Sequence, residues 1–519
     1  MVARNSVRRP AVLAIGFVVV MAMGLIYPAG VSAAQGALIP PLQNAKVTSF
    51  DGTQINVNFY PAAGLTRGQV APTVMEGSPW TLPALPGWLP TINSIGLGSF
   101  QLSVDMLGPA TLTADGYNVV TWDARGWYGS GGQINGDNPN FEGRDVTAII
   151  NWLATLPGVE LKAPNDPVVG MTGFSYGGGI QLTAASIDHR IDAIEPNASW
   201  YSLADSLLPN GVVKSGWGDI LCLTGDAVGA RYSPIMSTVC NSSFSGSYTQ
   251  SEVAQSNVVG PGSMVSQITT PTLLLVGGED TLFPINGDIA TYEALKAAAT
   301  PVKMMWYCGG HGICNQPLGA ADHVANVELA FFDKYLKGEN VSIGPGFEYL
   351  DQTGTWRSAA SYPVPVSSQV TASGSGLLGI SPFDTSGFLG IEATKAPNAL
   401  NIKVPAPTTS GETLTDPVLS LSYQGVATSF NVPVVAQLVD SATGTVLDNQ
   451  ATAIPLVLDG SPHTLTLPLN AVVWNLNPSS RITLQLTDAS DLFFPQQAFG
   501  LVHLQANLTL ATSAPGPAS

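Results

Sequence analysis

Short apolar runs alternate with amphipathic stretches over the first two thirds of the chain. Residues 145–156 carry Val146, Ile149, Ile150 and Leu153 at helical spacing, and 324–336 shows the same pattern. The apolar runs have the length of buried strands and occupy residues 73–76, 118–123, 168–172, 191–194, 272–276 and 303–307. Such a β-α-β-α order predicts a mostly parallel sheet covered by helices on both faces.

Two regions depart from this alternation. Residues 197–270 separate two predicted strands, and we interpret them as a cap over the carboxyl edge of the sheet, where open α/β sheets bind ligands. After about residue 340 the chain is rich in Thr, Ser, Val and Pro and alternates in the β pattern, with strands expected at 418–423, 433–439, 465–468 and 482–486. We therefore expect an α/β catalytic domain over residues 45–340 and a β-sandwich or jelly roll over 345–510.

The N-terminus has the features of an export signal. Arg4, Arg8 and Arg9 precede an apolar stretch at residues 11–26, and Val31-Ser32-Ala33 offers a cleavage site. We predict a signal peptide over residues 1–33 and a protein that is secreted or held at the cell envelope, without stable membrane insertion after cleavage. The alternative is an uncleaved membrane anchor.

Composition and charge narrow the function classes. Of 519 residues, 45% are hydrophobic and 11% charged, which is typical of a compact globular chain. The formal net charge of −17 disfavours nucleic-acid binding. Four cysteines in an exported chain predict two disulfides, for which three pairings are open. Proximity in sequence favours the pairs Cys222–Cys240 and Cys308–Cys314.

The candidate nucleophile is Ser175, within Gly173-Phe174-Ser175-Tyr176-Gly177. In a G-x-S-x-G sequence the serine occupies a tight strand-to-helix turn, and the glycines at ±2 avoid clashes there. The motif alone is weak evidence. Its context strengthens it, because a predicted strand precedes it and a helical pattern follows.

A serine hydroxyl needs a base, and the base needs an orienting carboxylate. Among five histidines, His311 follows a predicted strand and has glycines on both sides. Asp280 follows the apolar run at 273–276, with Glu279 as the alternative acid. The order Ser175, Asp280, His311 is that of α/β-hydrolases.

Two further details concern the site. We expect the backbone N–H of Tyr176 to be one oxyanion donor and the loop after residues 73–76, which contains Trp80, to supply the other. Zinc bound by Cys308, His311 and Cys314 is a disfavoured alternative, since no fourth ligand is evident and the compartment is oxidising. The mechanism requires no cofactor.

Together these motifs resemble the X-Pro dipeptidyl-peptidase and cocaine-esterase family of α/β-hydrolases, which includes α-amino-acid ester hydrolases. The resemblance spans about residues 45–510 and rests on the segments 123–132, 173–178, 280–283, 310–311, 332–336 and 347–356. It implies an α/β-hydrolase fold with a C-terminal jelly roll. The family often has a tyrosine as oxyanion donor after a proline. Here Trp80 follows Pro79, and its indole N–H is the corresponding donor.

The expected function is hydrolysis of a peptide, amide or ester bond through an acyl-Ser175 intermediate, with an X-Pro dipeptidyl-peptidase-like activity placed first. A carboxylesterase or α-amino-acid ester hydrolase is the first alternative. A free-amine pocket would favour the peptidase, for which Asp205, Asp219 and Asp226 of the cap are candidates. A lipase-like enzyme and an inert envelope- or carbohydrate-binding protein are the remaining hypotheses.

Overall fold

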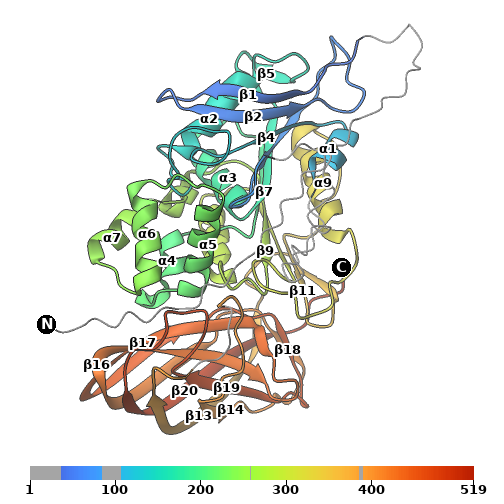
Figure 1. Ribbon diagram of the computed structural model, residues 1–519. Helices are drawn as coiled ribbons and strands as arrows, with labels where there is room; N and C mark the ends of the chain where they lie inside the picture. The colour runs from blue at the N-terminus through green and yellow to red at the C-terminus, as the bar shows by residue number, and fades with distance from the viewer. Residues whose placement is uncertain (1–36, 85–106, 258, 385–389) are drawn as a thin grey trace, which may run out of the picture. The chain divides into compact units, whose positions relative to one another are not determined.

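The computed structural model describes residues 37–84, 107–257, 259–384 and 390–519 (Figure 1). The signal peptide predicted for residues 1–33 lies outside this part of the chain. Within the described ranges, no helix combines the length and apolar character needed to cross a membrane.

A ten-stranded sheet forms the centre of the catalytic domain. Its order is β1-β2-β4-β3-β7-β8-β9-β10-β11-β12. The seven strands from β4 to β11 in this order run parallel, and β1, β2 and β12 add antiparallel edges. The strands are β1 Leu42–Thr48, β2 Gln54–Tyr60, β3 Thr73–Gly77, β4 Asn118–Trp122, β7 Val169–Phe174, β8 Ala193–Asn197, β9 Thr272–Gly277, β10 Val302–Tyr307, β11 Phe347–Leu350 and β12 Trp356–Ala359. The mostly parallel sheet predicted from the alternating pattern is thus confirmed.

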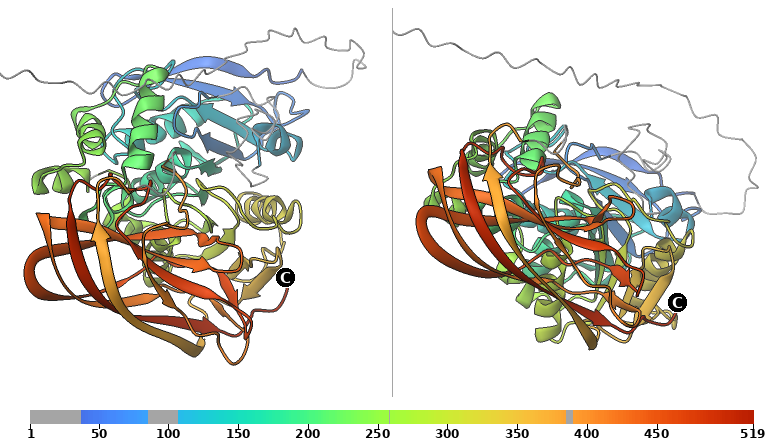
Figure 2. Two further views of the ribbon diagram at one scale, coloured as in Figure 1. Left: turned by 60° about the horizontal axis from the view of Figure 1, so that its bottom comes forward. Right: turned by 90° about the horizontal axis from the view of Figure 1, so that it is seen from below.

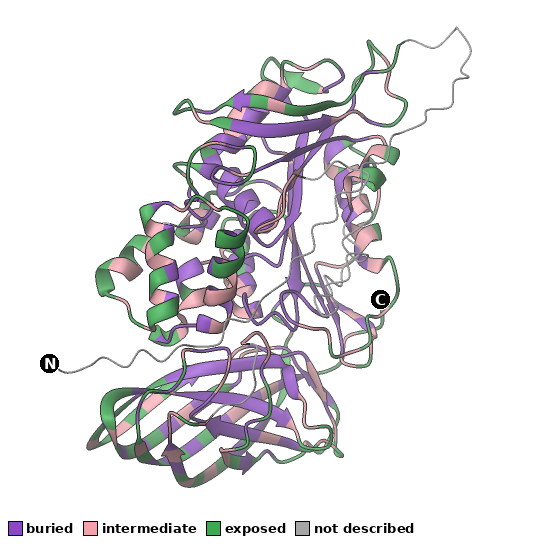
Figure 3. Ribbon diagram, viewed as in Figure 1, coloured by how far each residue is buried: buried purple, intermediate pink, exposed green. Residues whose placement is uncertain are grey.

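The central strands are buried on both faces, which explains their continuous apolar runs (Figure 3). Successive side chains point to opposite faces, so Met75 joins one core cluster and Val74 the other. Helices α2 (Glu142–Leu153), α3 (Tyr176–Ile187) and α8 (Ile285–Ala297) contribute to the first cluster. Helices α1 (Pro109–Ala114) and α9 (His323–Leu336) contribute to the second.

The segment between β8 and β9 is helical and corresponds to the predicted cap. It contains α4 (Leu203–Leu207), α5 (Ser215–Ala227), α6 (Pro234–Ser245) and α7 (Gln250–Ser256), with short 3-10 turns at Pro209–Gly211 and Gly262–Gln267 (Figure 1). Ser233 caps α6 and Thr249 forms a capping box with Glu252 at α7, so these two helix starts are fixed locally.

The C-terminal domain is an antiparallel β structure with its own core. Figure 2 shows its long, curved strands. They pair in the order β14-β19-β16-β20-β15-β18, with β13 on β20 and β17 on β16. The strands are β13 Val366–Ile380, β14 Leu400–Lys403, β15 Gly411–Thr413, β16 Val418–Asp440, β17 Val446–Pro468, β18 Trp474–Leu476, β19 Ile482–Thr487 and β20 Gly500–Ser513.

The structure corrects two details of the prediction. The segment 347–356 falls within the range 345–510 expected for the jelly roll, but it contains β11, which pairs with β10 of the catalytic sheet. The strands expected at 418–423 and 433–439 are parts of one strand, β16, which continues through the irregular pairing between Val426 and Asn431. Polar residues between two apolar runs look like a turn in sequence, whereas here they are the exposed middle of a long strand.

Candidate active site

Ser175 occupies the tight turn between β7 and α3. Its backbone has φ 59° and ψ −116°, a strained conformation for a residue with a side chain. The strand ends at Phe174 and the helix begins at Tyr176, so the hydroxyl projects at the carboxyl edge of the sheet. The local sequence therefore forms the predicted nucleophile turn.

The glycines of the motif are required by close backbone approach. A Cβ on Gly177 would lie 2.0 Å from the carbonyl oxygen of Gly77, on the neighbouring strand. Gly173 has φ +145°, and a Cβ there would lie 2.7 Å from the same oxygen. Larger residues at these positions would push the turn away from β3.

His311 connects Ser175 with Asp280. Its Nε2 lies 2.7 Å from Ser175 Oγ, and its Nδ1 lies 2.6 Å from Asp280 Oδ2. All three side chains are buried. The arrangement suits a neutral imidazole that donates from Nδ1 and accepts the serine proton at Nε2. The structure thus brings together three residues that are separated widely in the sequence.

Asp280 is fixed by four backbone and side-chain contacts. Its Oδ1 accepts the backbone N–H groups of Leu282 (2.9 Å) and Phe283 (2.7 Å). Its Oδ2 accepts the backbone N–H of His311 (3.0 Å) in addition to the imidazole. Gly310, at φ +103°, allows this approach, since a Cβ there would lie 2.6 Å from Asp280 Oδ2.

Glu279, the alternative acid, points to a different partner. It accepts the backbone and side-chain N–H groups of Asn315. Burial raises the pKa of Glu279 to about 7, and the nearby carboxylate of Glu392 acts in the same direction. Its role is to hold the segment after His311, while Asp280 contacts the imidazole itself.

Both disulfides join the cysteines that are neighbours in sequence. Cys222 of α5 is bonded to Cys240 of α6, and Cys308 is bonded to Cys314 across the His311 loop. In the described ranges, the one cluster of metal-ligand types comprises Glu279, Cys308 and Cys314. Because its sulfurs are bonded to each other, they are no thiolate ligands, and His311 contacts Asp280 and Ser175 instead. The zinc alternative has no support here.

Trp80 lies beside the site, but its indole N–H is engaged elsewhere. The Nε1 atom donates to the carbonyl of Leu221 in the cap, at 2.9 Å. The ring packs edge-on against Tyr176 and Trp127, with centroids 5.3 and 4.7 Å away. In this arrangement Trp80 forms a wall of the site. The Tyr176 N–H and the backbone of the loop after β3 stay the predicted oxyanion donors.

A pocket opens beside Ser175, and we call it the inner pocket. Mostly aromatic and aliphatic residues line it, from the Ser175 turn, from the loop at 280–283 that carries Asp280 (the acid loop) and from the cap. They are Trp80, Gly136, Ser175, Tyr176, Trp200, Leu203, Leu207, Gly218, Leu221, Cys222, Met236, Val239, Leu282 and Phe283. No charged residue of the described part of the chain lines this pocket, which suits an apolar group of a substrate.

Sequence reasoning missed two residues that hold the acid loop. Lys214 of the cap donates through Nζ to the carbonyls of Thr281 (2.9 Å) and Leu282 (3.1 Å). Burial lowers the pKa of Lys214 to about 7, although Asp280 opposes this shift. Gln450 of β17 donates through Nε2 to the backbone carbonyl of Asp280, at 3.0 Å. No local sequence signal marks either residue, since each contact joins distant segments.

The loop at 308–314 that carries His311, which we call the base loop, also contacts the C-terminal domain. The backbone N–H of Ile313 donates to Glu392, at 3.1 Å, and Asn449 of β17 donates to the same carboxylate. The acid and base loops are therefore each held by hydrogen bonds to residues that lie outside the catalytic sheet.

Arg125, in the loop after β4, is a buried charge that is paired with two carboxylates. Its guanidinium binds Asp145 with two hydrogen bonds, of 2.7 and 2.6 Å, and Asp51 at 3.0 Å. The pair fixes the loop after β4 to α2.

The fold is that of an α/β-hydrolase with a cap and a C-terminal β domain, and solved structures share it. A CocE/NonD family hydrolase from Staphylococcus aureus has a TM-score of 0.69 at 14% identity, covering 91% of this chain and 93% of that one. An α-amino acid ester hydrolase has a TM-score of 0.67 at 13% identity, with coverages of 94% and 98%. An aminopeptidase from a marine sediment Thaumarchaeota archaeon has a TM-score of 0.66 at 15% identity, with coverages of 93% and 99%.

Residues 51–233 match the family model described as X-Pro dipeptidyl-peptidase (S15 family). This segment includes the Ser175 turn and the first half of the cap, through α5, and the match confirms the resemblance predicted from the motifs. A search of the curated proteins found no match. The comparisons support a hydrolase, and they leave the choice of bond to the site itself.

Proposed function

We propose that this protein is an exported serine hydrolase that cleaves carboxylic esters with an apolar acyl group through an acyl-Ser175 intermediate. The observation that carries the proposal is the hydrogen-bonded series Asp280–His311–Ser175 opening onto the apolar inner pocket. Export rests on the basic and apolar pattern of residues 1–33 and on the two disulfides.

In the proposed reaction, Ser175 Oγ attacks the ester carbonyl while His311 Nε2 takes the hydroxyl proton. Asp280 stabilises the imidazolium. The oxyanion of the tetrahedral intermediate accepts the N–H of Tyr176 at the start of α3. The intermediate collapses, the C–O bond to the alcohol breaks, and His311 returns the proton to the leaving alcohol. Water, deprotonated by His311, then attacks the acyl-Ser175. The bond from the acyl carbon to Ser175 Oγ breaks, His311 returns the proton to Oγ, and the acid is released.

The lining of the inner pocket favours esters over peptides with a free amine. A buried α-ammonium group needs a carboxylate partner. Asp205 and Asp226 are exposed, and Asp219 accepts the hydroxyl of Ser243. None of the three lines the inner pocket. An apolar acyl group, in contrast, would replace water against the aromatic and aliphatic surfaces of the pocket.

An X-Pro dipeptidyl-peptidase-like activity is the second candidate. It is supported by the family match over residues 51–233 and by the fold shared with the archaeal aminopeptidase. An α-amino-acid ester hydrolase would combine the two, since it acts on an ester next to a free amine.

The experiment compares p-nitrophenyl butyrate with Ala-Pro-p-nitroanilide, using the mature protein and its Ser175→Ala variant. We expect hydrolysis of the butyrate that is lost in the variant. Cleavage of the anilide at a higher kcat/KM would establish the peptidase instead. Equal ester hydrolysis by both proteins would overturn the role of Ser175.

A further inference from the structure

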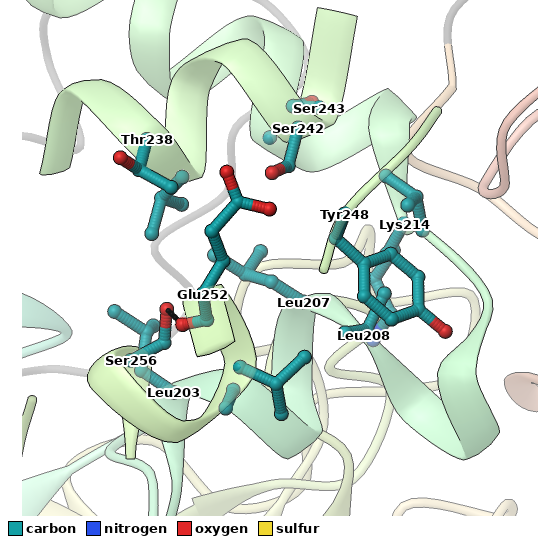
Figure 4. A pocket seen from close by; sticks show the side chains of 15 residues that line it. Leu203, Leu207, Leu208, Lys214, Thr238, Ser242, Ser243, Tyr248, Glu252 and Ser256 are labelled. Atoms are coloured by element: carbon teal, nitrogen blue, oxygen red, sulfur yellow. Dashed lines mark hydrogen bonds between the residues drawn. The ribbon is translucent and has the colours of Figure 1, made fainter. Parts of the chain in front are cut away.

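The cap contains a second cavity, which we call the outer cavity, bounded by helices α4 to α7 (Figure 4). Aliphatic side chains cover much of its wall, among them Leu208, Val213 and Val253. Four residues line both this cavity and the inner pocket, namely Leu203, Leu207, Gly218 and Val239. The two spaces are therefore neighbours, separated by the thickness of single side chains.

We propose that the outer cavity is the binding site for the distal part of a long acyl chain. The carbonyl carbon is held at Ser175, the first methylenes fill the inner pocket, and the chain continues past Leu207 and Val239 into the cap. This inference rests on the proposed function and names its substrate class, which is esters of long-chain rather than short-chain carboxylic acids.

The charged residues around the outer cavity are engaged by the protein. The Lys214 ammonium group donates to the carbonyls of Thr281 and Leu282, in the acid loop. The Glu252 carboxylate accepts the backbone N–H of Thr249 within the capping box of α7. The remaining polar groups include the hydroxyls of Thr238 and Ser242 on α6. An uncharged chain can therefore occupy the cavity without displacing the hydrogen bonds of these two charged groups.

The boundary between the two spaces is held in place covalently. A Cβ on Gly218 would lie 2.4 Å from Ser243 Oγ, so α5 and α6 pack closely at this glycine. Four residues further along α5, Cys222 is bonded to Cys240, which directly follows Val239. The cap disulfide thus fixes the spacing of the two helices that carry Gly218 and Val239, and with it the position of the residues that separate the two spaces.

The test measures kcat/KM for p-nitrophenyl acetate, butyrate, octanoate and decanoate. We expect the wild-type protein to prefer octanoate and decanoate. In Ser242→Phe the new ring would fill the outer cavity and lower the decanoate-to-acetate ratio by about tenfold or more. Thr238→Phe fills the cavity from the preceding turn of α6 and should act in the same way. Acetate hydrolysis should persist in both variants, because its acyl group stays in the inner pocket.

Ser237→Phe is the matched control, since Ser237 is exposed on the same helix and lines neither space. Its decanoate-to-acetate ratio should equal that of the wild type. A wild-type preference for acetate or butyrate would overturn the inference. So would an unchanged ratio in a filled variant that still hydrolyses acetate. Ester hydrolysis that survives in Ser175→Ala would instead refute the proposed function, so the two failures are distinguishable.

Discussion

The acid and base loops differ from the cap in how they are held. Asp280 accepts four hydrogen bonds and His311 makes two directional contacts through its ring. The cap helices, in contrast, bound their cavities mainly with aliphatic side chains. Directional contacts fail when one atom is changed, whereas apolar contacts tolerate changes of shape at constant volume. The chemistry should therefore be sensitive to isosteric substitutions, and the cap should tune which substrates enter.

The largest expected effect comes from Asp280→Asn. The amide cannot hold the imidazole in the required tautomer or stabilise the imidazolium, so kcat should fall about 10⁴-fold. Ester hydrolysis at saturating substrate measures this. Glu279→Gln is the matched control, one residue away, and should retain most of the wild-type kcat. A comparable loss in both variants would contradict the assignment of the acid.

Glu279→Gln should change stability in a pH-dependent way. Burial raises the pKa of Glu279 from 4.5 to about 7, so between these values the folded chain holds a proton that the unfolded chain has lost. The wild type therefore loses stability as pH rises from 4.5 to 7, by up to about 3 kcal/mol. Glutamine removes this dependence. Urea unfolding at pH 5 and pH 8 should show that the free energy of unfolding of the variant, relative to that of the wild type, is higher at pH 8 than at pH 5. A constant difference would argue against the shift.

The two disulfides should separate stability from activity. Cys222–Cys240 closes 18 residues and Cys308–Cys314 closes 6. Chain entropy then predicts losses of about 3 and about 2 kcal/mol in the respective double serine variants. The second variant should also lose kcat, because its loop carries His311, while the first should keep acetate hydrolysis. Denaturant unfolding and ester assays on both variants provide the measurement. Reversal of this pattern would show that the cap supports the chemistry directly.

The smallest effect is expected for Trp80→Phe. The Trp80 N–H donates to Leu221 and not toward Ser175, so kcat should fall by less than about tenfold. Loss of a true oxyanion donor would cost about 10²–10³-fold. Since Trp80 lines the inner pocket, KM should respond more than kcat. A large decrease in kcat alone would show that the indole N–H of Trp80 is an oxyanion donor after all.

Local patterns were enough to find the groups that the structure joins at the site. Ser175 stands in a turn that only glycine neighbours permit, and Asp280 and His311 each follow a strand, at the edge where the loops of a parallel sheet meet. Lys214 and Gln450 could not be found in this way. Each is an ordinary polar residue whose importance comes from its partner, which lies 67 and 170 residues away along the chain.

The sequence pattern also could not predict where the boundary between the two domains lies. A strand of four residues such as β11 reads the same whether it pairs with a parallel or an antiparallel neighbour. Its pairing with β10 is decided by the packing of Phe347 and Tyr349 into the core of the catalytic sheet. Strand pairing depends on what is nearby in space, which periodicity does not encode.

The contacts of Gln450 and Asn449 have a consequence for how this protein can evolve or be engineered. Two adjacent residues of β17 help to fix the loops that carry Asp280 and His311, through the Asp280 carbonyl and the Glu392 carboxylate. The β domain is thus no interchangeable module. A chimaera that took its C-terminal domain from a relative would keep the architecture. It would need equivalent contacts to hold Asp280 and His311 in their catalytic positions.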